Sequence, residues 1–208
     1  MPSLKHERLC IAPVVGVDEA GRGPLAGPVV AAAVILPAKG VPRGLDDSKK
    51  LTAATRATLH DRIKERAVVG IGICEAEEID SLNIYWATMK AMTLAVDQIA
   101  GALGCDPGHV LVDGNRLPRW SYAATAIVKG DAISLSIAAA SIVAKHTRDT
   151  IMIAHAESYP HYGWHSNKGY GAPDHLRALR EYGPTPLHRR SFAPVASLYG
   201  KELAVLPL

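Results

Sequence analysis

Short apolar runs alternate with longer segments of helical spacing along this chain. The runs are rich in Val, Ile and Ala and predict buried strands at residues 14–17, 29–36, 68–73, 110–112 and 126–128. Three longer segments predict helices at 52–66, 83–100 and 132–156. Thr52 is the expected N-cap of the first helix. The short connection between the first two runs predicts an antiparallel pair.

The pattern changes after Pro160. Residues 160–173 are rich in glycine, histidine and aromatic rings, and a short helix over 174–182 precedes a tail interrupted by prolines. This order of elements predicts an α/β fold, with a mixed β-sheet flanked by helices. We expect a single domain over residues 1–208, in which residues from about 160 to 208 form a helical C-terminal extension packed on the rest.

The composition supports a folded, globular chain. Of the 208 residues, 48% are hydrophobic and 21% charged, which supplies a core and excludes a disordered chain. The three cysteines, Cys10, Cys74 and Cys105, are widely spaced and form no C-x-x-C pair. They therefore predict buried thiols in a reducing compartment, with neither a disulfide framework nor a zinc knuckle.

Nothing in the sequence predicts export or a membrane span. Charged residues come before any apolar stretch at the N-terminus, so the apolar region of a signal peptide is missing. The most apolar run, residues 29–36, is far shorter than the roughly 20 residues that cross a bilayer. We therefore expect a cytoplasmic monomer that has no contact with membranes.

Two adjacent carboxylates, Asp18 and Glu19, directly follow the first predicted strand. Burying them without partners would cost several kcal/mol, which a hard ion such as Mg²⁺ or Mn²⁺ would relieve. The alternative is that both acids are exposed where the strand ends. Consecutive strand residues also point to opposite faces, so Glu19 can join Asp18 only if the strand breaks there, which Ala20 and Gly21 would permit.

Two further acids stand at the ends of predicted elements. Asp113 follows the fourth apolar run, where the carboxyl ends of strands commonly bind ligands. Asp113-Gly114 is equally a hairpin-turn signal. Asp131 precedes the long helix and could simply be its N-cap. Four acids at such positions, without paired His or Cys ligands, favour Mg²⁺ or Mn²⁺ chemistry on phosphates with two ions.

Nine motifs, in order from about residue 14 to 195, resemble the bacterial ribonuclease HII family, the type 2 ribonucleases H. The most specific is the stretch from Val17 to Val29, VDEAGRGPLAGPV. The others are DSKKL at 47–51, LNI at 82–84, DGN at 113–115, KGD at 129–131, ASIVAK at 140–145 with RD at 148–149, KGYG at 168–171 and HRRSF at 188–192.

The resemblance implies a ribonuclease H-like fold and a metal-dependent endoribonuclease. Such an enzyme hydrolyses the RNA strand of RNA·DNA hybrids and cuts 5′ of single ribonucleotides in duplex DNA, with a role in ribonucleotide excision repair. The products carry a 5′-phosphate and a 3′-hydroxyl. The catalytic acids of the family, which hold the Mg²⁺ or Mn²⁺ ions, fall on Asp18, Glu19, Asp113 and Asp131.

Further family positions imply how the substrate is bound. Gly21, Arg22 and Gly23 would read the 2′-hydroxyl, because glycines let the backbone approach a sugar closely. Tyr170 would lie against the sugar of the next, deoxy residue. The alternative for the glycine segment is an ordinary tight turn, and the alternative for Tyr170 is a tyrosine packed in its loop. Ser48 and the cations near it would contact phosphates, as would a group of basic residues later in the chain. The full set of phosphate candidates is Ser48, Lys49, Lys50, Lys145, Arg148, Lys168, Arg189 and Arg190.

Two other hypotheses remain. The chain could be a nucleic-acid-binding module of this fold without catalysis, or another nuclease or strand transferase that also cuts DNA alone. A zinc site at His161 and His165 is disfavoured, because Pro160 and Gly163 interrupt the helix that their spacing would need.

Overall fold

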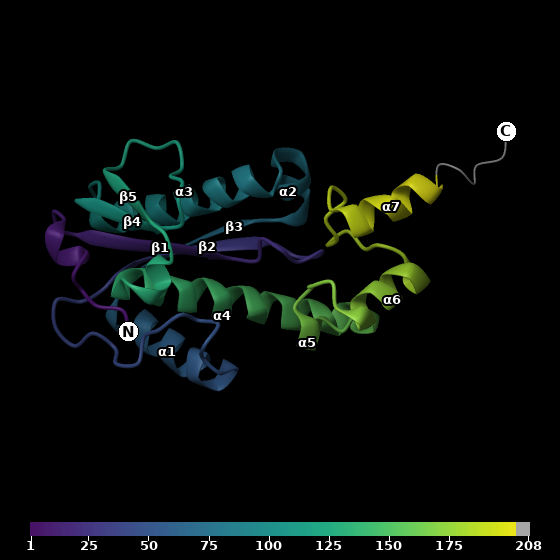
Figure 1. Ribbon diagram of the computed structural model, residues 1–208, viewed down its shortest axis with the longest axis horizontal. Helices are drawn as coiled ribbons and strands as arrows, with labels where there is room; N and C mark the ends of the chain where they lie inside the picture. The colour runs from purple at the N-terminus through teal and green to yellow at the C-terminus, as the bar shows by residue number, and fades with distance from the viewer. Residues whose placement is uncertain (203–208) are drawn as a thin grey trace.

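The computed structural model describes residues 1–202 and contains one five-stranded mixed sheet (Figure 1). The strands are β1 Val14–Ala20, β2 Val29–Ile35, β3 Val68–Cys74, β4 His109–Asp113 and β5 Ala124–Ile127, in the order β3-β2-β1-β4-β5. β1 pairs antiparallel with β2, as predicted, and β2 with β3. β4 lies parallel to both β1 and β5, so β1 and β4 end at the same edge of the sheet.

Helices cover both faces of the sheet. The helices are α1 Ala53–Arg66, α2 Ala76–Leu82, α3 Ile84–Leu103, α4 Leu135–Ser158, α5 Trp164–Asn167, α6 Pro173–Tyr182 and α7 Ala193–Glu202. α3 packs on one face through a core that includes Met92 and Val96. α4 packs on the other face, with α1 outside it (Figure 1). The predicted mixed sheet flanked by helices is confirmed.

The small residues of α4 let it lie directly on the sheet. Gly16 of β1 faces the start of α4, where an added Cβ would stand 2.1 Å from the carbonyl carbon of Ser136. No side chain fits in that space, so glycine is required there. This close approach fixes the position of α4 relative to β1, and it places Ser141 of α4 beside Asp18.

The C-terminal segment packs through a third core at the far end of α4. This core joins Trp164 and Leu179 to Leu25 and Met152 from the main body. Asp80 of α2 also accepts hydrogen bonds from the amides of Arg190 and Ser191. The prediction of a helical region after residue 160 is confirmed for the described residues, whereas residues 203–208 of the expected extension lie outside them.

Several boundaries differ from the prediction. The helix predicted over 83–100 is α3, with Asn83 as its N-cap, and the separate α2 before it was not predicted. α4 begins at Leu135, because a 3₁₀ turn, Gly130–Ala132, precedes it. Thr52 caps α1 as predicted. Cys105 is exposed, so the expectation of three buried thiols is wrong. Within the described residues, no helix has both the length and the apolar character needed to cross a membrane.

Candidate active site

Asp18 and Asp113 lie side by side at the end of two parallel strands. Val17 pairs with Val112, so the next residue of each strand carries a carboxylate at the same edge. Pairing of β1 with β2 continues to Ala20, so the strand does not break at Glu19, the condition that the sequence analysis set for Glu19 to join Asp18. The carboxylate of Asp113 nevertheless acts on both Asp18 and Glu19. Asp113, at the end of β4, thus interacts with both Asp18 and Glu19, although consecutive residues of β1 point to different sides of the strand.

The two simpler interpretations of Asp113 and Asp131 are wrong. β4 and β5 are parallel, so Asp113-Gly114 is not a hairpin turn. Its Oδ1 accepts a hydrogen bond from the Gly130 amide at 2.6 Å, which ties the 3₁₀ turn containing Asp131 to the end of β4. Ser134, and not Asp131, caps α4. Asp131 therefore does not cap the helix, and it lies close enough to Asp113 for the charge of Asp113 to raise its pKa.

The four acids, which we call the acidic edge, repel one another. Burial raises the pKa of Asp18 well above its usual range, and Glu19 and Asp113 raise it further. Burial also raises the pKa of Glu19, although the Arg22 guanidinium 3.4 Å away opposes the shift. The pKa of Asp131 is raised by burial and by Asp113. Grouping these carboxylates costs free energy that a cation would recover.

The donor set fits a hard divalent ion that shares its coordination with substrate. Carboxylate oxygens are the ligands that Mg²⁺ and Mn²⁺ favour. Among residues 1–202, no three Asp, Glu, His or Cys side chains enclose a point closely enough to form a complete site by themselves. This agrees with the usual behaviour of Mg²⁺, which one or two carboxylates, waters and substrate phosphates hold together.

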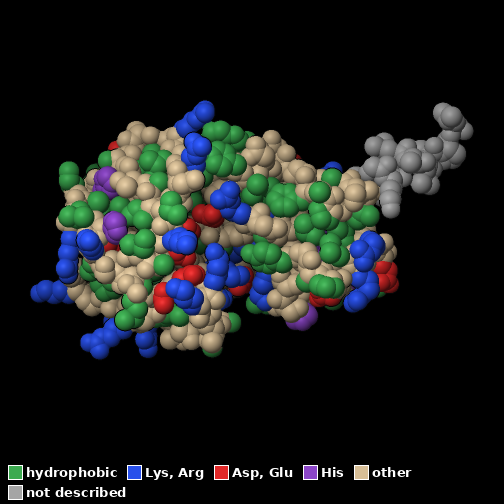
Figure 2. All heavy atoms as spheres, viewed as in Figure 1, with side chains coloured by type: hydrophobic (Ala, Val, Ile, Leu, Met, Phe, Trp, Pro, Cys, Tyr) green, Lys and Arg blue, Asp and Glu red, His purple; other side chains and the backbone are tan. Residues whose placement is uncertain are grey.

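A cavity of about 340 Å³ opens beside Asp18 and Glu19. Seven of the twelve residues predicted to contact substrate line it: Gly21, Arg22, Gly23, Ser48, Lys49, Lys145 and Tyr170. Ser48 is buried and accepts a hydrogen bond from Ser141 at 2.9 Å, while Lys145 pairs with Asp149 at 2.6 Å. Figure 2 shows acidic side chains in the middle of this face, with Lys and Arg side chains around them.

Gly21 and Gly23 are glycines for different reasons. At Gly21, where φ is +97°, an added Cβ would stand 2.0 Å from Nε of Arg148, so the fold itself excludes a side chain. At Gly23, a Cβ would meet only the ring of Tyr170, at an ordinary 3.7 Å. Packing within the chain therefore does not require glycine at position 23.

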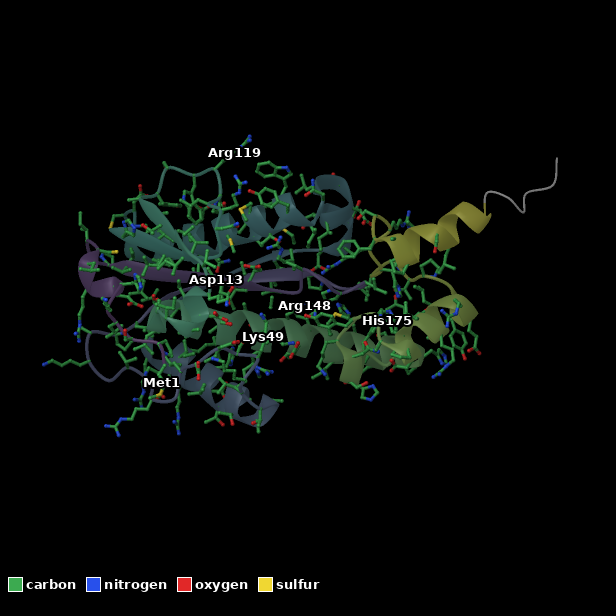
Figure 3. All side chains as sticks on the ribbon, viewed as in Figure 1. Met1, Lys49, Asp113, Arg119, Arg148 and His175 are labelled. Atoms are coloured by element: carbon green, nitrogen blue, oxygen red, sulfur yellow. The ribbon has the colours of Figure 1, made fainter. Side chains whose placement is uncertain are left out.

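Arg148 and Arg189 are not available to phosphates, which corrects that expectation. Both are buried and donate only to backbone carbonyls. Arg189 binds the carbonyls of Gly21, Arg22, Gly27 and Pro28; Arg148 binds those of Ala26, Pro28 and Lys168. We call this pair the arginine clamp (Arg148 is labelled in Figure 3). It sets the path of the loop between β1 and β2.

Two buried histidines, which the sequence analysis missed, hold the backbone of Tyr170. Nδ1 of His175 donates to the Tyr170 carbonyl at 2.8 Å. Its Nε2 must then accept, from the Trp164 indole and from Nε2 of His188. Nδ1 of His188 accepts from the Thr185 amide. The contacts fit only two neutral rings, and burial accordingly lowers the pKa of His188 to about 3.

The chain matches one protein family over almost its whole length. The family model described as Ribonuclease HII matches residues 15–195. A ribonuclease HII from Rhizorhabdus wittichii is 60% identical over 195 residues, 94% of this chain and 95% of its own length. One from Erythrobacter litoralis is 61% identical over 188 residues, 88% of each chain.

Solved structures agree with this assignment. The crystal structure of the ribonuclease H2 from Pyrococcus horikoshii superposes with a TM-score of 0.75 at 26% identity, covering 90% of this chain and 97% of that one. A Bst-RNase HIII in complex with Mn²⁺ has the same fold, with a TM-score of 0.63 at 20% identity, over 90% of this chain and 69% of its own. The chain therefore belongs to the ribonuclease HII family and is a metal-dependent ribonuclease H.

Proposed function

We propose that this enzyme hydrolyses the RNA strand of RNA·DNA hybrids and also cuts 5′ of single ribonucleotides within duplex DNA, leaving 5′-phosphate and 3′-hydroxyl ends. One observation carries the proposal. Asp18 and Glu19 of the acidic edge border the same cavity as Gly23 and the ring of Tyr170, so carboxylates that can hold a metal ion lie beside groups that can read a sugar. Excision of ribonucleotides from DNA is the repair role that fits such a cut.

Asp18, Glu19, Asp113 and Asp131 would hold the divalent metal, which we propose to be two ions of Mg²⁺ or Mn²⁺. When bound, the metal supplies activation of a water and stabilisation of the leaving oxygen. The chain fixes these acids before substrate arrives. Asp113 is held by the Gly130 amide and Asp18 by the Glu19 amide, so little reorganisation is needed on binding.

The remaining cavity residues would select and orient the substrate. The open space at Gly23 would admit a ribose with its 2′-hydroxyl, and the backbone of Gly21 and Arg22 would contact that group. Tyr170, nearly half exposed, would pack against the sugar of the following deoxynucleotide. Ser48, Lys49 and Lys145 would contact the flanking phosphates.

Domain organisation, oligomeric state and location are also proposals. We infer one domain of 208 residues with the region after about residue 160 as a packed extension, because the third core joins Trp164 to Leu25 and Met152. We further propose a cytoplasmic monomer.

The proposal is tested with a DNA duplex that contains one ribonucleotide. The purified protein should cut this duplex once, 5′ of the ribonucleotide, and leave the all-DNA duplex intact. Asp18→Asn and excess EDTA should each abolish the cut, while the variant still binds the duplex. Cleavage of the all-DNA duplex would favour a different nuclease, and binding without any cleavage would favour a non-catalytic module.

A further inference from the structure

A second groove lies on the other side of the sheet edge from Lys49. Its lining is mostly apolar and includes Leu82, Trp86, Met89, Thr93, Pro118 and Arg119, around a volume of about 400 Å³. We call it the Trp86 groove. Leu82 and Trp86 are each 38% exposed, as is Leu117 in the loop beside it. In Figure 3, Arg119 projects on the α3 side of the sheet and Lys49 on the α4 side, with Asp113 between them.

The groove adjoins a hollow that borders part of the acidic edge. Met89 lines both the Trp86 groove and a smaller hollow of about 250 Å³. That hollow also contains Glu19, Asp113, Asn115 and Arg116. The groove is therefore separated from two of the catalytic acids by the width of one shared side chain. A polymer bound at those acids would pass into it.

The charge of the groove favours an anionic occupant. The Arg119 guanidinium lies 4.7 Å from the centre of the Trp86 ring. Neither Arg116 nor Arg119 forms an ion pair with any carboxylate of the described residues, whereas Lys90 at the rim is neutralised by Glu78 at 2.6 Å. One such arginine beside an exposed aromatic ring, with the second in the adjoining hollow, matches a phosphate backbone together with the apolar face of its sugars or bases.

We propose that the Trp86 groove and the adjoining hollow form a second contact site for the substrate duplex, in which Arg116 of the hollow and Arg119 of the groove pair with backbone phosphates beyond the cut and Trp86 packs against the sugars between them. The inference rests on the proposed function, because the occupant is the same nucleic acid. It adds a requirement on the length of the substrate, because one arm of the duplex must extend far enough from the cut to enter the groove.

The test is a double variant, Arg116→Gln with Arg119→Gln, assayed on duplexes with one ribonucleotide and arms trimmed stepwise on either side. With long arms we expect Kd in EDTA and KM in Mg²⁺ to rise several-fold, and the slope of log K against log salt to fall by roughly 2, about one per phosphate lost. In Arg119→Gln alone, the single-turnover rate at saturating substrate should stay unchanged, because Arg119 lies outside the hollow that contains Glu19 and Asp113. Trimming the arm that reaches the groove should make wild type and variant equal.

Matched variants separate this effect from a general loss of positive charge. Arg66→Gln removes an exposed arginine from α1, on the opposite face of the sheet, and should leave Kd and the salt slope unchanged. Trp86→Ala should weaken binding of long duplexes, whereas Trp86→Phe should retain most of it; thermal unfolding checks that each variant is folded.

Two results would overturn the proposal. One is an unchanged Kd and salt slope in the double variant, including the case in which the groove proves to bind a protein instead. The other is an equal loss on long and trimmed duplexes. Failure of the proposed function is seen separately, since wild type would then cut no ribonucleotide duplex at any arm length.

Discussion

The acidic edge and the arginine clamp both place charged groups out of solvent, but only the clamp is complete. Every guanidinium nitrogen of Arg189 donates to a backbone carbonyl, through four hydrogen bonds of 2.6–3.1 Å. The acidic edge has mainly like charges for neighbours, and burial raises the pKa values of Asp18, Glu19 and Asp131. Arg22 is the one guanidinium that ion-pairs with it among the described residues.

The difference separates a structural use of charge from a functional one. A buried charge whose hydrogen bonds are all satisfied stabilises one backbone path, and removing it leaves unpaired carbonyls. Buried charges that repel one another lower stability unless a ligand compensates them. The clamp therefore belongs to the fold, whereas we propose that the acidic edge belongs to the reaction. Substitutions in the two regions should have opposite effects on stability and on catalysis.

The largest expected effect is on catalysis, at the acidic edge. Asp113→Asn keeps an oxygen that accepts from the Gly130 amide but removes one charge, so we expect cleavage to fall at least about 10⁴-fold, or roughly 5.5 kcal/mol. The melting temperature should stay the same or rise, because one repulsive charge is gone. Single-turnover cleavage and thermal unfolding measure the two; a large loss of stability would place Asp113 with the clamp.

The opposite result is expected for the clamp. Arg189→Met removes the four hydrogen bonds to the carbonyls of Gly21, Arg22, Gly27 and Pro28 and should cost about 3–5 kcal/mol of unfolding free energy. Denaturant unfolding gives this value. Equal stability in Arg189→Met and wild type would show that the loop keeps its path without the guanidinium.

The histidines behind Tyr170 predict a pH dependence of stability. Burial, and next the neighbouring His175, lower the folded pKa of His188 to about 3, below the usual 6.5. The unfolded chain therefore binds the proton more readily, and stability falls as the pH drops below about 6.5. At pH 5 the loss is about 2 kcal/mol.

Two variants test whether the buried His188 imidazole causes that pH dependence of stability. His188→Gln should flatten the fall in unfolding free energy between pH 7 and pH 5, whereas His165→Gln, at an exposed position, should leave it unchanged. Parallel curves for His188→Gln and wild type would mean that other groups cause the fall.

The smallest effects concern selection of substrate within the cavity. Tyr170→Ala should reduce cleavage at single ribonucleotides about tenfold more than cleavage in long hybrids, a difference of about 1.4 kcal/mol. Gly23→Ala should fold normally, because its Cβ has room, yet lose cleavage of both substrates. Measurements of kcat/KM for each variant on the two substrates, and the ratio of the two values, check these expectations. Equal losses in Tyr170→Ala would show that the ring does not read the junction.

Some elements escaped prediction for identifiable reasons. The N-cap of α2 is Glu75, which forms with Glu78 a reciprocal capping box that usually starts with Ser or Thr. α7 was interpreted as a broken tail because Pro194 suggested a break, but proline is tolerated in the first turn of a helix. Arg148 and Arg189 were assigned to phosphates because sequence alone does not tell a buried guanidinium from an exposed one.

The sequence by itself determined the strands, the main helices and the identity of the four acids, since apolar spacing, caps and motifs are local properties. Only the tertiary structure decided what those acids face. The parallel pairing of β1 with β4 brings Asp113 to Asp18 across 95 positions of the chain. The tertiary structure also decided that backbone carbonyls enclose the arginine clamp, while Arg116 and Arg119 form no ion pair with the described residues. Burial and pairing of charge depend on contacts between distant segments, and no local pattern encodes them.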